Sequence, residues 1–516
     1  MDLRYDLPFL FIVFSLLAAF VMPFFARWKK ELCAPLTIFA TGSSFVVSII
    51  FVIFVLEGGE LTYGVGGWDP PYGIEIMVDS LTSVMLLLVT GVSFLISIFS
   101  LRSVRKEVGD EARGWYYVQF LLCMIAMVGL VISRDMFNIY VYIEIVGISA
   151  CALVVSKGDR IATEATLKYL LLATIGSGFI LLGIGFIYMI TGHLNLIYAG
   201  EALKLVSGDY PFLLWVTMSF FVVGFGIKAA LFPLHLWLPD AHSSAPSGSS
   251  AMLSSLVVKV YIVSLFKMIF IVFGLEMFED TTNIKMLILV MAAAAILGGS
   301  FFAFVQLELK RRLAYSTVAQ VGYIFLGIGL GTPEGMLAAF FHIIVHAFMK
   351  TVLFLCAGAI YYQTGRKKVT QFAGLGYTMP ITMGAFLIAS FSMVGIPATG
   401  GFISKFYLGL GSLAAGYPIF ILLIVVSGLL NAMYYFPILW QAYFVSDSSN
   451  SGDEGSDDHD HGHGSSAPKF KLDKVPVTML APIVILALGV IFLGLFFNYS
   501  FELLQMIVDK YLMFGY

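Results

Sequence analysis

The stretch Ser219–Gly248, "SFFVVGFGIKAALFPLHLWLPDAHSSAPSG", is an apolar run that carries one lysine, Lys228, and then breaks at Pro233 and Pro239. The run predicts a membrane helix, because about 20 apolar residues span a bilayer. Proline ends a helix and leaves backbone N–H and C=O groups unpaired, and within a membrane these must be buried in protein or face a wet cavity. The stretch therefore predicts a membrane helix that is interrupted beside a buried cation.

The whole chain has the composition of a polytopic membrane protein. Of its 516 residues, 59% are hydrophobic and only 12% are charged, whereas an ordinary soluble domain has about 25% charged residues. We expect about 14 membrane spans, at 7–26, 35–56, 79–101, 115–133, 136–156, 165–190, 212–232, 246–273, 283–306, 314–331, 336–361, 380–406, 417–444 and 475–498. The sequence thus predicts an all-α, multi-pass protein of the cell membrane (inner or plasma).

Lysines and arginines are concentrated in every second connection between these spans. The odd-numbered connections hold Arg27, Lys29, Lys30, Arg102, Arg105, Lys106, Arg113, Lys157, Arg160, Lys310, Arg311, Arg312, Arg366, Lys367, Lys368, Lys469, Lys471 and Lys474. The even-numbered ones hold only Arg134, Lys204 and Lys285. The positive-inside rule then predicts that the odd connections are cytoplasmic and that both termini lie outside. The first apolar run lacks a small-residue cleavage site, so we interpret it as a span and expect no cleavable signal peptide.

A second interrupted span occurs at Phe391–Phe406, "FSMVGIPATGGFISKF". It lies five spans after the first, so the two segments cross the membrane in opposite directions. Broken helices at matching positions of two inverted repeats indicate a transport site. We therefore expect N-terminal helices one to three (1–112), a first five-helix repeat (113–275), a second (283–445), a polar loop (446–474), and helix fourteen with a tail (475–516).

The loop 446–474 is rich in Gly, Ser, Asp and His, a composition that cannot build a core and predicts a mobile cytoplasmic segment. Its run His459–His463 could bind a metal, but a solvated acidic linker is the favoured interpretation. The cysteines occur singly and in no cluster-ligand spacing, at Cys33, Cys123, Cys151 and Cys356. We expect no metal, no cofactor of its own and no nucleic-acid partner.

The cations inside the spans are all lysines: Lys168, Lys228, Lys259, Lys267, Lys350 and Lys405. A charge at the bilayer centre costs at least about 2.5–3.5 kcal/mol, so such residues are functional candidates. Lysine can release its proton when it is desolvated, whereas arginine stays charged. A lysine-only set therefore favours proton handling over structural pairing. For Lys168 and Lys267, which lie nearer span ends, a side chain that reaches the interface is the alternative.

Glu144, in "FNIYVYIEIVGISACALVV", is the only carboxylate predicted to lie so deep in a span. Its first candidate partner is Lys228. A static buried pair is the alternative, since such a pair can cost as much in desolvation as it returns. With several deep lysines near it, coupling between the carboxylate and the amines is the stronger interpretation.

Span eleven, "FFHIIVHAFMKTVLFLCAG", places His342, His346 and Lys350 at i, i+4 and i+8, nearly on one helix face. Histidine titrates near neutrality, so this column suits a water-linked proton relay. An H-x-x-x-H pair could also bind zinc, but Ile343 stands where the zinc protease motif has glutamate. If the two halves pack face to face, a polar line forms from Glu144, Lys228, Lys259, His342, His346, Lys350 and Lys405.

The chain resembles the antiporter-like subunits shared by respiratory complex I, Mrp-type cation/proton antiporters and energy-converting membrane-bound hydrogenases. The stretches that carry this resemblance are "FNIYVYIEIVG", "GFGIKAALFPLHLWLPDAHSSAPSGSSAML", "ELKRRLAYSTVAQVGY", "HIIVHAFMKTVLFLCAG" and "GIPATGGFISKF". Without a long lateral helix, the chain looks more like the D-type Mrp subunit, or its hydrogenase equivalent, than the A-type subunit.

The resemblance implies roles for particular residues. It implies that Glu144 in helix five pairs with Lys228 in broken helix seven. It places His242 at the start of the half-channel that leads to Lys259 in helix eight. The other residues implied in translocation are His342, His346 and Lys350 in helix eleven and Lys405 in broken helix twelve. The partners implied are other antiporter-like subunits, with a hydrogenase or another redox module as a further candidate.

Three functions fit the sequence. The first is a proton- or sodium/proton-translocating subunit of a multi-subunit membrane complex, without redox chemistry of its own and not catalytic alone. The second is a quinone-linked redox subunit, which a bound flavin, haem or cluster in the purified subunit would favour. The third is a stand-alone Na+/H+ antiporter, which activity of the chain without partners would favour. The sequence leaves open whether H+ or Na+ is carried, and in which parent complex.

Overall fold

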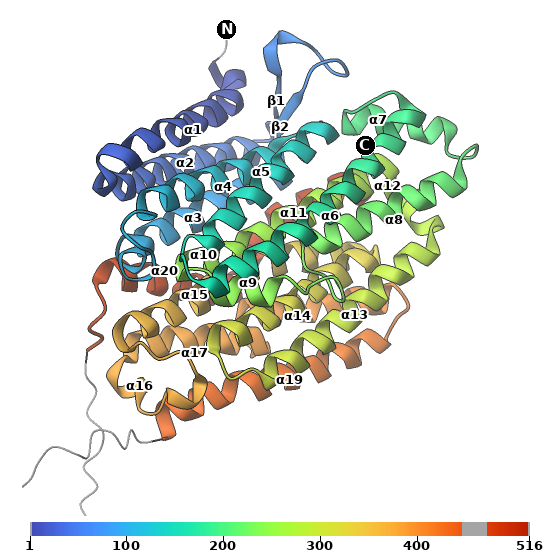
Figure 1. The fold of residues 1–516 in the computed structure, drawn as a ribbon. Helices are drawn as coiled ribbons and strands as arrows, with labels where there is room; N and C mark the ends of the chain where they lie inside the picture. The colour runs from blue at the N-terminus through green and yellow to red at the C-terminus, as the bar shows by residue number, and fades with distance from the viewer. Residues whose placement is uncertain (1–2, 446–471, 514–516) are drawn as a thin grey trace, which may run out of the picture.

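The computed structural model describes residues 3–445 and 472–513, and it is a bundle of long helices (Figure 1). Thirteen helices within these ranges are long and apolar enough to cross a membrane. The remaining predicted segment, 380–406, is divided into two shorter helices. The predicted all-α polytopic fold is therefore confirmed. The candidate metal run His459–His463 and most of the predicted loop 446–474 lie outside the described residues.

The N-terminal part combines three membrane helices with a small β-hairpin. Its elements are α1 (Leu3–Trp28), η1 (Lys30–Leu32), α2 (Cys33–Leu56), β1 (Leu61–Gly64), η2 (Val65–Gly67), β2 (Glu75–Val78) and α3 (Ser80–Glu107). The strands are antiparallel, with Leu61 opposite Val78. The polar connection before α3 gave no strand prediction, because these strands are only four residues long.

The middle of the chain covers the range of the first predicted repeat. It comprises α4 (Arg113–Ile132), α5 (Met136–Val155), α6 (Arg160–Thr191), α7 (Leu196–Val206), α8 (Pro211–Lys228), α9 (Leu238–Ser244), α10 (Ser247–Met252), η3 (Leu253–Val257), α11 (Val258–Lys267), η4 (Met268–Phe273) and α12 (Gly274–Asp280). The short helix α7 lies between two spans and was not predicted. Elements α10 to α12 follow one another as a single 34-residue helical rod.

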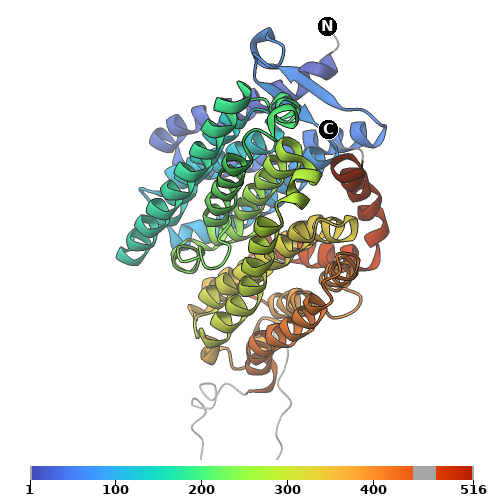
Figure 2. The ribbon, with the colours of Figure 1, turned by 90° about the vertical axis from the view of Figure 1, so that its right-hand side faces the viewer.

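The last part covers the range of the second predicted repeat and the C-terminal helices. It comprises α13 (Thr282–Val305), α14 (Leu309–Leu330), α15 (Pro333–Thr364), η5 (Val369–Gln371), α16 (Leu375–Thr378), α17 (Pro380–Val394), α18 (Gly400–Ala414), α19 (Ile419–Phe444), α20 (Val477–Leu495), α21 (Phe497–Val508) and η7 (Asp509–Met513). Figures 1 and 2 show α1 beginning and η7 ending at the same end of the molecule, beside the hairpin.

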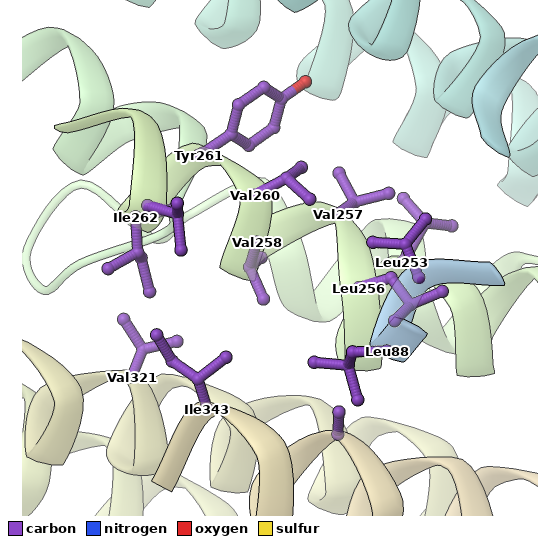
Figure 3. Close-up of a cluster of buried hydrophobic side chains, with 14 of the residues drawn as sticks. Leu88, Leu253, Leu256, Val257, Val258, Val260, Tyr261, Ile262, Val321 and Ile343 are labelled. Atoms are coloured by element: carbon purple, nitrogen blue, oxygen red, sulfur yellow. The ribbon is translucent and has the colours of Figure 1, made fainter. Parts of the chain in front are cut away.

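The rod α10–α12 is the most buried membrane helix, and its central 18-residue stretch is wholly covered by other parts of the chain. Figure 3 shows why it sits at the centre of the bundle: Tyr261 points to one side, whereas Ile262 points toward Val321 of α14 and Ile343 of α15. The Tyr261 hydroxyl reaches the Ile143 carbonyl of α5 at 3.5 Å. A helix that is hydrophobic all round is expected where both faces are covered. The rod, most of which belongs to the first predicted repeat, thus packs against helices of both predicted halves.

Both predicted helix breaks are present. Helix α8 ends at Lys228, and a non-helical segment with Ala230 at φ +56° follows before α9. Helix α17 ends at Val394, and Gly395 (φ +94°) and Ala398 (φ +68°) precede α18. An alanine in the left-handed region costs about 1–2 kcal/mol, so each break has to be held by its surroundings.

Side chains donate to carbonyl groups at the ends of the two helices that the breaks interrupt. The Trp237 indole N–H donates to the Ile227 carbonyl at 2.8 Å, at the end of α8. The Asn431 amide of α19 donates to the Met393 carbonyl at 3.1 Å, at the end of α17. Unpaired backbone groups are costly where water is excluded, and these contacts remove that cost. The breaks are thus specific, stabilised features.

Candidate ion-translocation site

Glu144 and Lys228 are in contact, as the sequence predicted. The Lys228 amine lies 3.3 Å from Glu144 Oε1 and 5.8 Å from the centre of the Tyr261 ring. The Ser177 hydroxyl of α6 donates to the same carboxylate oxygen. The Lys228 side chain is 1% exposed, whereas that of Glu144 is 32% exposed on the outer surface of α5. The pair therefore connects the interior of the bundle to one of its faces.

The residues after the first break lie in two different environments. His242 is fully buried, and neither ring nitrogen has a hydrogen-bond partner among the described residues. His235 is buried against the Phe232 ring at 4.9 Å. Asp240 instead forms ion pairs with Lys168 (3.1 Å) and Arg311 (3.0 Å) near the surface. Of these three polar side chains, His242 faces the interior of the helix bundle, whereas Asp240 lies near its surface.

Lys259 lies at the centre of the buried rod and donates to the Ser254 carbonyl one turn earlier. The Ser254 hydroxyl in turn shares a hydrogen bond of 2.7 Å with Thr317 of α14. The segment Leu253–Val257 is a π-helical turn, a geometry that often marks functional sites because it displaces backbone groups from their usual partners. The widened turn provides Lys259 with a neutral acceptor.

Lys350 is fully buried in α15 and is likewise held by neutral groups. It donates to the Leu313 carbonyl at 2.7 Å and to the Ser316 hydroxyl, both from α14. Ser316 is also 3.1 Å from the Tyr435 hydroxyl of α19. Lys259, like Lys350, is fully buried. In the described part of the chain, neither amine has a carboxylate partner.

The two histidines of α15 stack as the i, i+4 spacing predicts, with ring centres 5.6 Å apart. His342 Nδ1 lies 2.9 Å from the Ser404 hydroxyl of α18, and its ring lies 5.5 Å from that of Tyr323. His346 is fully buried, and both its ring nitrogens lack a partner among the described residues. No cluster of three metal-ligand side chains occurs within residues 3–445 and 472–513.

Lys405 of α18 folds back on the second break. Its amine donates to the carbonyls of Met393 (2.7 Å) and Val394 (2.9 Å), the last residues of α17, and it lies 5.0 Å from the centre of the Tyr323 ring. A side chain at Gly395 would crowd Lys405, whose Cδ it would meet at 3.0 Å, and the positive φ of Gly395 favours glycine at this position. The C-terminal end of a helix favours a cation.

A further cluster, not predicted from the sequence, lies at the end of the bundle near the hairpin. Asp79 and Arg134 form an ion pair of 2.7 Å in which both side chains are fully buried. The Tyr511 hydroxyl and the Lys510 amine of η7 also reach Asp79, at 2.7 and 3.4 Å. We call these four residues the outer cluster. Burial alone would raise the pKa of Asp79, but the charges of Arg134, Lys510 and Lys267 outweigh it and lower that pKa well below its usual range.

Lys267 lies beside this cluster and is 1% exposed. It donates to the carbonyls of Val131 and Ser133, at the end of α4. The interpretation of Lys267 as a side chain that reaches the membrane surface is therefore wrong. Lys168, by contrast, is half exposed and pairs with Glu164 at 3.0 Å as well as with Asp240. Its amine therefore lies at the surface of the helix bundle.

Sequence reasoning missed the uncharged residues that hold the charged ones. Ser177, Ser316 and Ser404 contact Glu144, Lys350 and His342 respectively. Serine is common in membrane helices, and most of its hydroxyls bond within their own helix. Only Ser404 had a signal in the sequence, because it stands directly before the candidate residue Lys405.

A many-helix membrane bundle with two interrupted helices and several buried amines and imidazoles has the features of a membrane ion-transport protein. Comparisons with known families agree with this class. Residues 133–431 match the family described as "NADH:quinone oxidoreductase/Mrp antiporter, TM", and residues 70–107 match "NADH-Ubiquinone oxidoreductase (complex I), chain 5 N-terminus". The chain belongs to the NADH:quinone oxidoreductase/Mrp antiporter family.

Individual relatives come from both branches of this family. The chain is 36% identical to the N subunit of an NADH-quinone oxidoreductase of Desulforudis audaxviator over 496 residues, 95% of this chain and 96% of the relative. It is 31% identical to the D-type subunit of a Na(+)/H(+) antiporter of Bacillus subtilis, over 76% of this chain and 78% of the relative.

Solved structures agree on the fold. A chain of the membrane-bound sulfane sulfur reductase, an archaeal respiratory membrane complex, superposes with a TM-score of 0.87 at 28% identity, covering 98% of this chain and 99% of that one. A chain of the Mrp complex from Dietzia sp. DQ12-45-1b gives a TM-score of 0.85 at 23% identity, covering 99% and 98%.

Proposed function

We propose that this chain is the proton-translocating, antiporter-like subunit of a multi-subunit membrane complex. The observation that carries the proposal is the contact between Glu144 and Lys228 at 3.3 Å, beside an interrupted membrane helix. The chain's likeness to one subunit of an NADH-quinone oxidoreductase and to one subunit of a Na(+)/H(+) antiporter supports it.

Proton transfer along the polar line begins with the state of Glu144. While the carboxylate is ionised, it holds the Lys228 amine in its charged form. When the carboxylate takes up a proton, the amine loses its counter-charge in a medium of low dielectric and releases its own proton. The released proton then moves through His242 and along the other residues of the line: Lys259, Lys350, His346, His342 and Lys405.

The chemistry of this line favours H+ over Na+ as the ion carried. Amines and imidazoles bind and release protons, but a charged lysine has no acceptor for a metal ion. Beyond Glu144, the buried cations Lys259, Lys350 and Lys405 form no ion pair with a carboxylate among the described residues. A Na+ ion here would be repelled by the charged amines, and the carbonyl oxygens beside them already accept from those amines.

The exposure of Glu144 supports a role within a complex rather than as a stand-alone transporter. Its side chain is 32% exposed on a face where Phe137, Val141, Ile145 and Ile148 are also exposed. A mid-span carboxylate that faced lipid would be costly. We infer that a neighbouring antiporter-like subunit covers this face of α5 in the complex, and that both termini lie outside, as the lysine and arginine distribution indicates.

The test measures proton movement in membrane vesicles that contain the assembled complex. Glu144→Gln and Lys228→Met should each reduce translocation to background while the chain remains in the complex. Lys285→Met is the matched control, because Lys285 forms a lysine–glutamate pair of 2.5 Å with Glu279 away from the line; it should translocate normally. Wild-type translocation should persist in sodium-free buffer.

Three results would contradict the proposal. One is normal proton movement per assembled complex in both Glu144→Gln and Lys228→Met. Another is a bound flavin, haem or cluster in the purified chain, which would favour the quinone-linked redox alternative. The third is full Na+/H+ exchange by this chain expressed without partners, which would favour the stand-alone antiporter.

A further inference from the structure

Helix α14 presents a row of polar side chains toward α15. Ser316, Gln320 and Tyr323 stand at i, i+4 and i+7, so they share one face of the helix. All three are buried, and Gln320 is fully so. Ser316 and Tyr323 contact residues of the polar line, but neither the sequence analysis nor the proposed pathway gives Gln320 a role.

Two contacts fix how this row lies against α15. Ser316 accepts from Lys350 at one end, and the Tyr323 ring lies 5.5 Å from that of His342 at the other. Helices α14 and α15 pack against each other and are joined by a connection of only two residues, so they run antiparallel. Gln320 lies between Ser316 and Tyr323, and His346 lies halfway between Lys350 and His342. The register therefore places Gln320 opposite His346.

Gln320 and His346 share an unusual property. Within the described ranges, the Oε1 and Nε2 atoms of Gln320 and both ring nitrogens of His346 have no hydrogen-bond partner from the chain. His342 Nε2, one turn away, is in the same condition. A buried polar atom without a hydrogen-bond partner destabilises the fold, because it has lost the hydrogen bonds that water would give it. Buried water, with about three hydrogen bonds each, is the usual partner of such groups.

We propose that Gln320 and His346 together bind internal water, and that Gln320 is a positioning residue for proton transfer between Lys350 and His342. This inference rests on the proposed function. The amide has both a donor and an acceptor, so it can hold a water molecule in either orientation. A water that passes a proton along must afterwards reverse its orientation. Gln320 accommodates both states without binding the proton itself.

Other occupants fit this position less well. A metal ion would be repelled by Lys350, which donates to Ser316, one turn from Gln320 on α14. A direct Gln320–His346 hydrogen bond would satisfy one atom of each residue and leave the others unpaired. Water satisfies all of them, and it is the occupant that a proton relay requires.

The test uses the assembled complex with Gln320→Met, which keeps the shape of the side chain and removes its polar atoms. Gln320→Met should slow proton translocation about tenfold, equivalent to about 1.4 kcal/mol in the barrier. Gln320→Asn, which keeps the amide and leaves room for one more water, should restore most of the rate. Ser300→Ala is the control, because the Ser300 hydroxyl donates to the Ile296 carbonyl of its own helix; it should leave the rate unchanged.

The proposal is overturned if Gln320→Met translocates at the wild-type rate, or if Gln320→Asn is as slow as Gln320→Met, since the amide would then have no specific role. If Gln320→Met does not assemble, the test is made on the wild-type complex, whose structure is determined by electron cryo-microscopy at a resolution that shows ordered water. Water density touching both Gln320 and His346 supports the proposal, and a dry contact between them overturns it. Loss of translocation in Glu144→Gln alongside normal Gln320→Met would retain the proposed function and reject only this inference.

Discussion

Two buried ion pairs in this molecule have the same formal charges but different surroundings. Asp79 and Arg134 are 2.7 Å apart, both fully buried, and Asp79 also accepts from Tyr511, Lys510 and the Thr82 N–H. Glu144 and Lys228 are 3.3 Å apart, and Glu144 is a third exposed. Besides the lysine, Glu144 accepts only from the Ser177 hydroxyl among the described residues.

The difference separates a structural pair from an exchangeable one. Arginine keeps its charge under all ordinary conditions and presents several donors, so it suits a pair that must not change. Lysine has one amine, which can become neutral when its counter-charge is lost. The outer cluster joins Asp79 and Arg134 to the C-terminal element η7, whereas Glu144 and Lys228 stand at the start of the proposed polar line. We expect the first pair to carry stability and the second to carry transport.

The largest expected effect is on stability and comes from Asp79→Asn. Removing one partner of a buried ion pair leaves the other charge uncompensated, which typically costs about 3–5 kcal/mol. The free energy of unfolding in mixed micelles should fall by this amount, while proton translocation per assembled complex stays normal. Tyr511→Phe removes one hydrogen bond to Asp79 and is the milder control, at about 1 kcal/mol. An unchanged stability in Asp79→Asn would contradict the structural role of the outer cluster.

The same variant predicts a pH dependence. Because its partners lower the pKa of Asp79, the carboxylate contributes stability above its unfolded pKa of about 3.9 and loses it as the pH falls toward the folded value. The difference in unfolding free energy between wild type and Asp79→Asn should therefore be constant near neutrality and shrink in acid buffer. A difference that grew on acidification would mean that Asp79 is not held ionised by these partners.

The second-largest effect is expected when the lysine of the Glu144–Lys228 pair is replaced by arginine. Lys228→Arg keeps the positive charge beside Glu144 but replaces an amine that can release its proton by a guanidinium that cannot. Translocation should fall on the order of a hundredfold, equivalent to about 2.7 kcal/mol in the barrier, while the complex still assembles. A Lys228→Arg complex that pumps normally would show that the cation is needed only as a fixed charge.

The sequence predicted much of this picture, because its strongest signals are local. Long apolar runs, glycine and proline at the breaks, and charged residues inside spans identified the fold, both interrupted helices and the contact between Glu144 and Lys228. Each of these signals is visible in one stretch of sequence. The other predicted site residues could be named for the same reason, and their roles in translocation stay predictions.

What the sequence did not predict depends on contacts between distant segments. The outer cluster joins Asp79 to Lys510 and Tyr511, more than 400 residues further along the chain. The acceptors of the buried lysines are mostly backbone carbonyls, such as Leu313 for Lys350, and every residue type supplies these. The exposure of Glu144 depends on which face of α5 the other helices leave uncovered.

The third-largest effect is expected for Arg134→Lys, which is the reverse of the Lys228→Arg substitution. Arg134→Lys keeps a positive charge beside Asp79 but removes the donor fork that lets arginine serve several acceptors. We expect a loss of about 1–2 kcal/mol in unfolding free energy, from one or two hydrogen bonds, and unchanged proton translocation. Arg134→Lys and Lys228→Arg thus make a matched pair, in which one lowers stability and the other lowers transport. If both variants lowered the same quantity, the distinction between the two ion pairs would be lost.

The smallest effect tests the one hydroxyl that contacts the functional pair. Ser177 donates to the Glu144 oxygen that Lys228 also approaches, and a hydrogen bond to a charged group favours the ionised carboxylate. Ser177→Ala should therefore lower the translocation rate about fivefold, which corresponds to roughly 1 kcal/mol. The effect should disappear in a Glu144→Gln background, because the hydroxyl acts only through that carboxylate. A rate equal to wild type would show that the Ser177 hydroxyl has no role in transport.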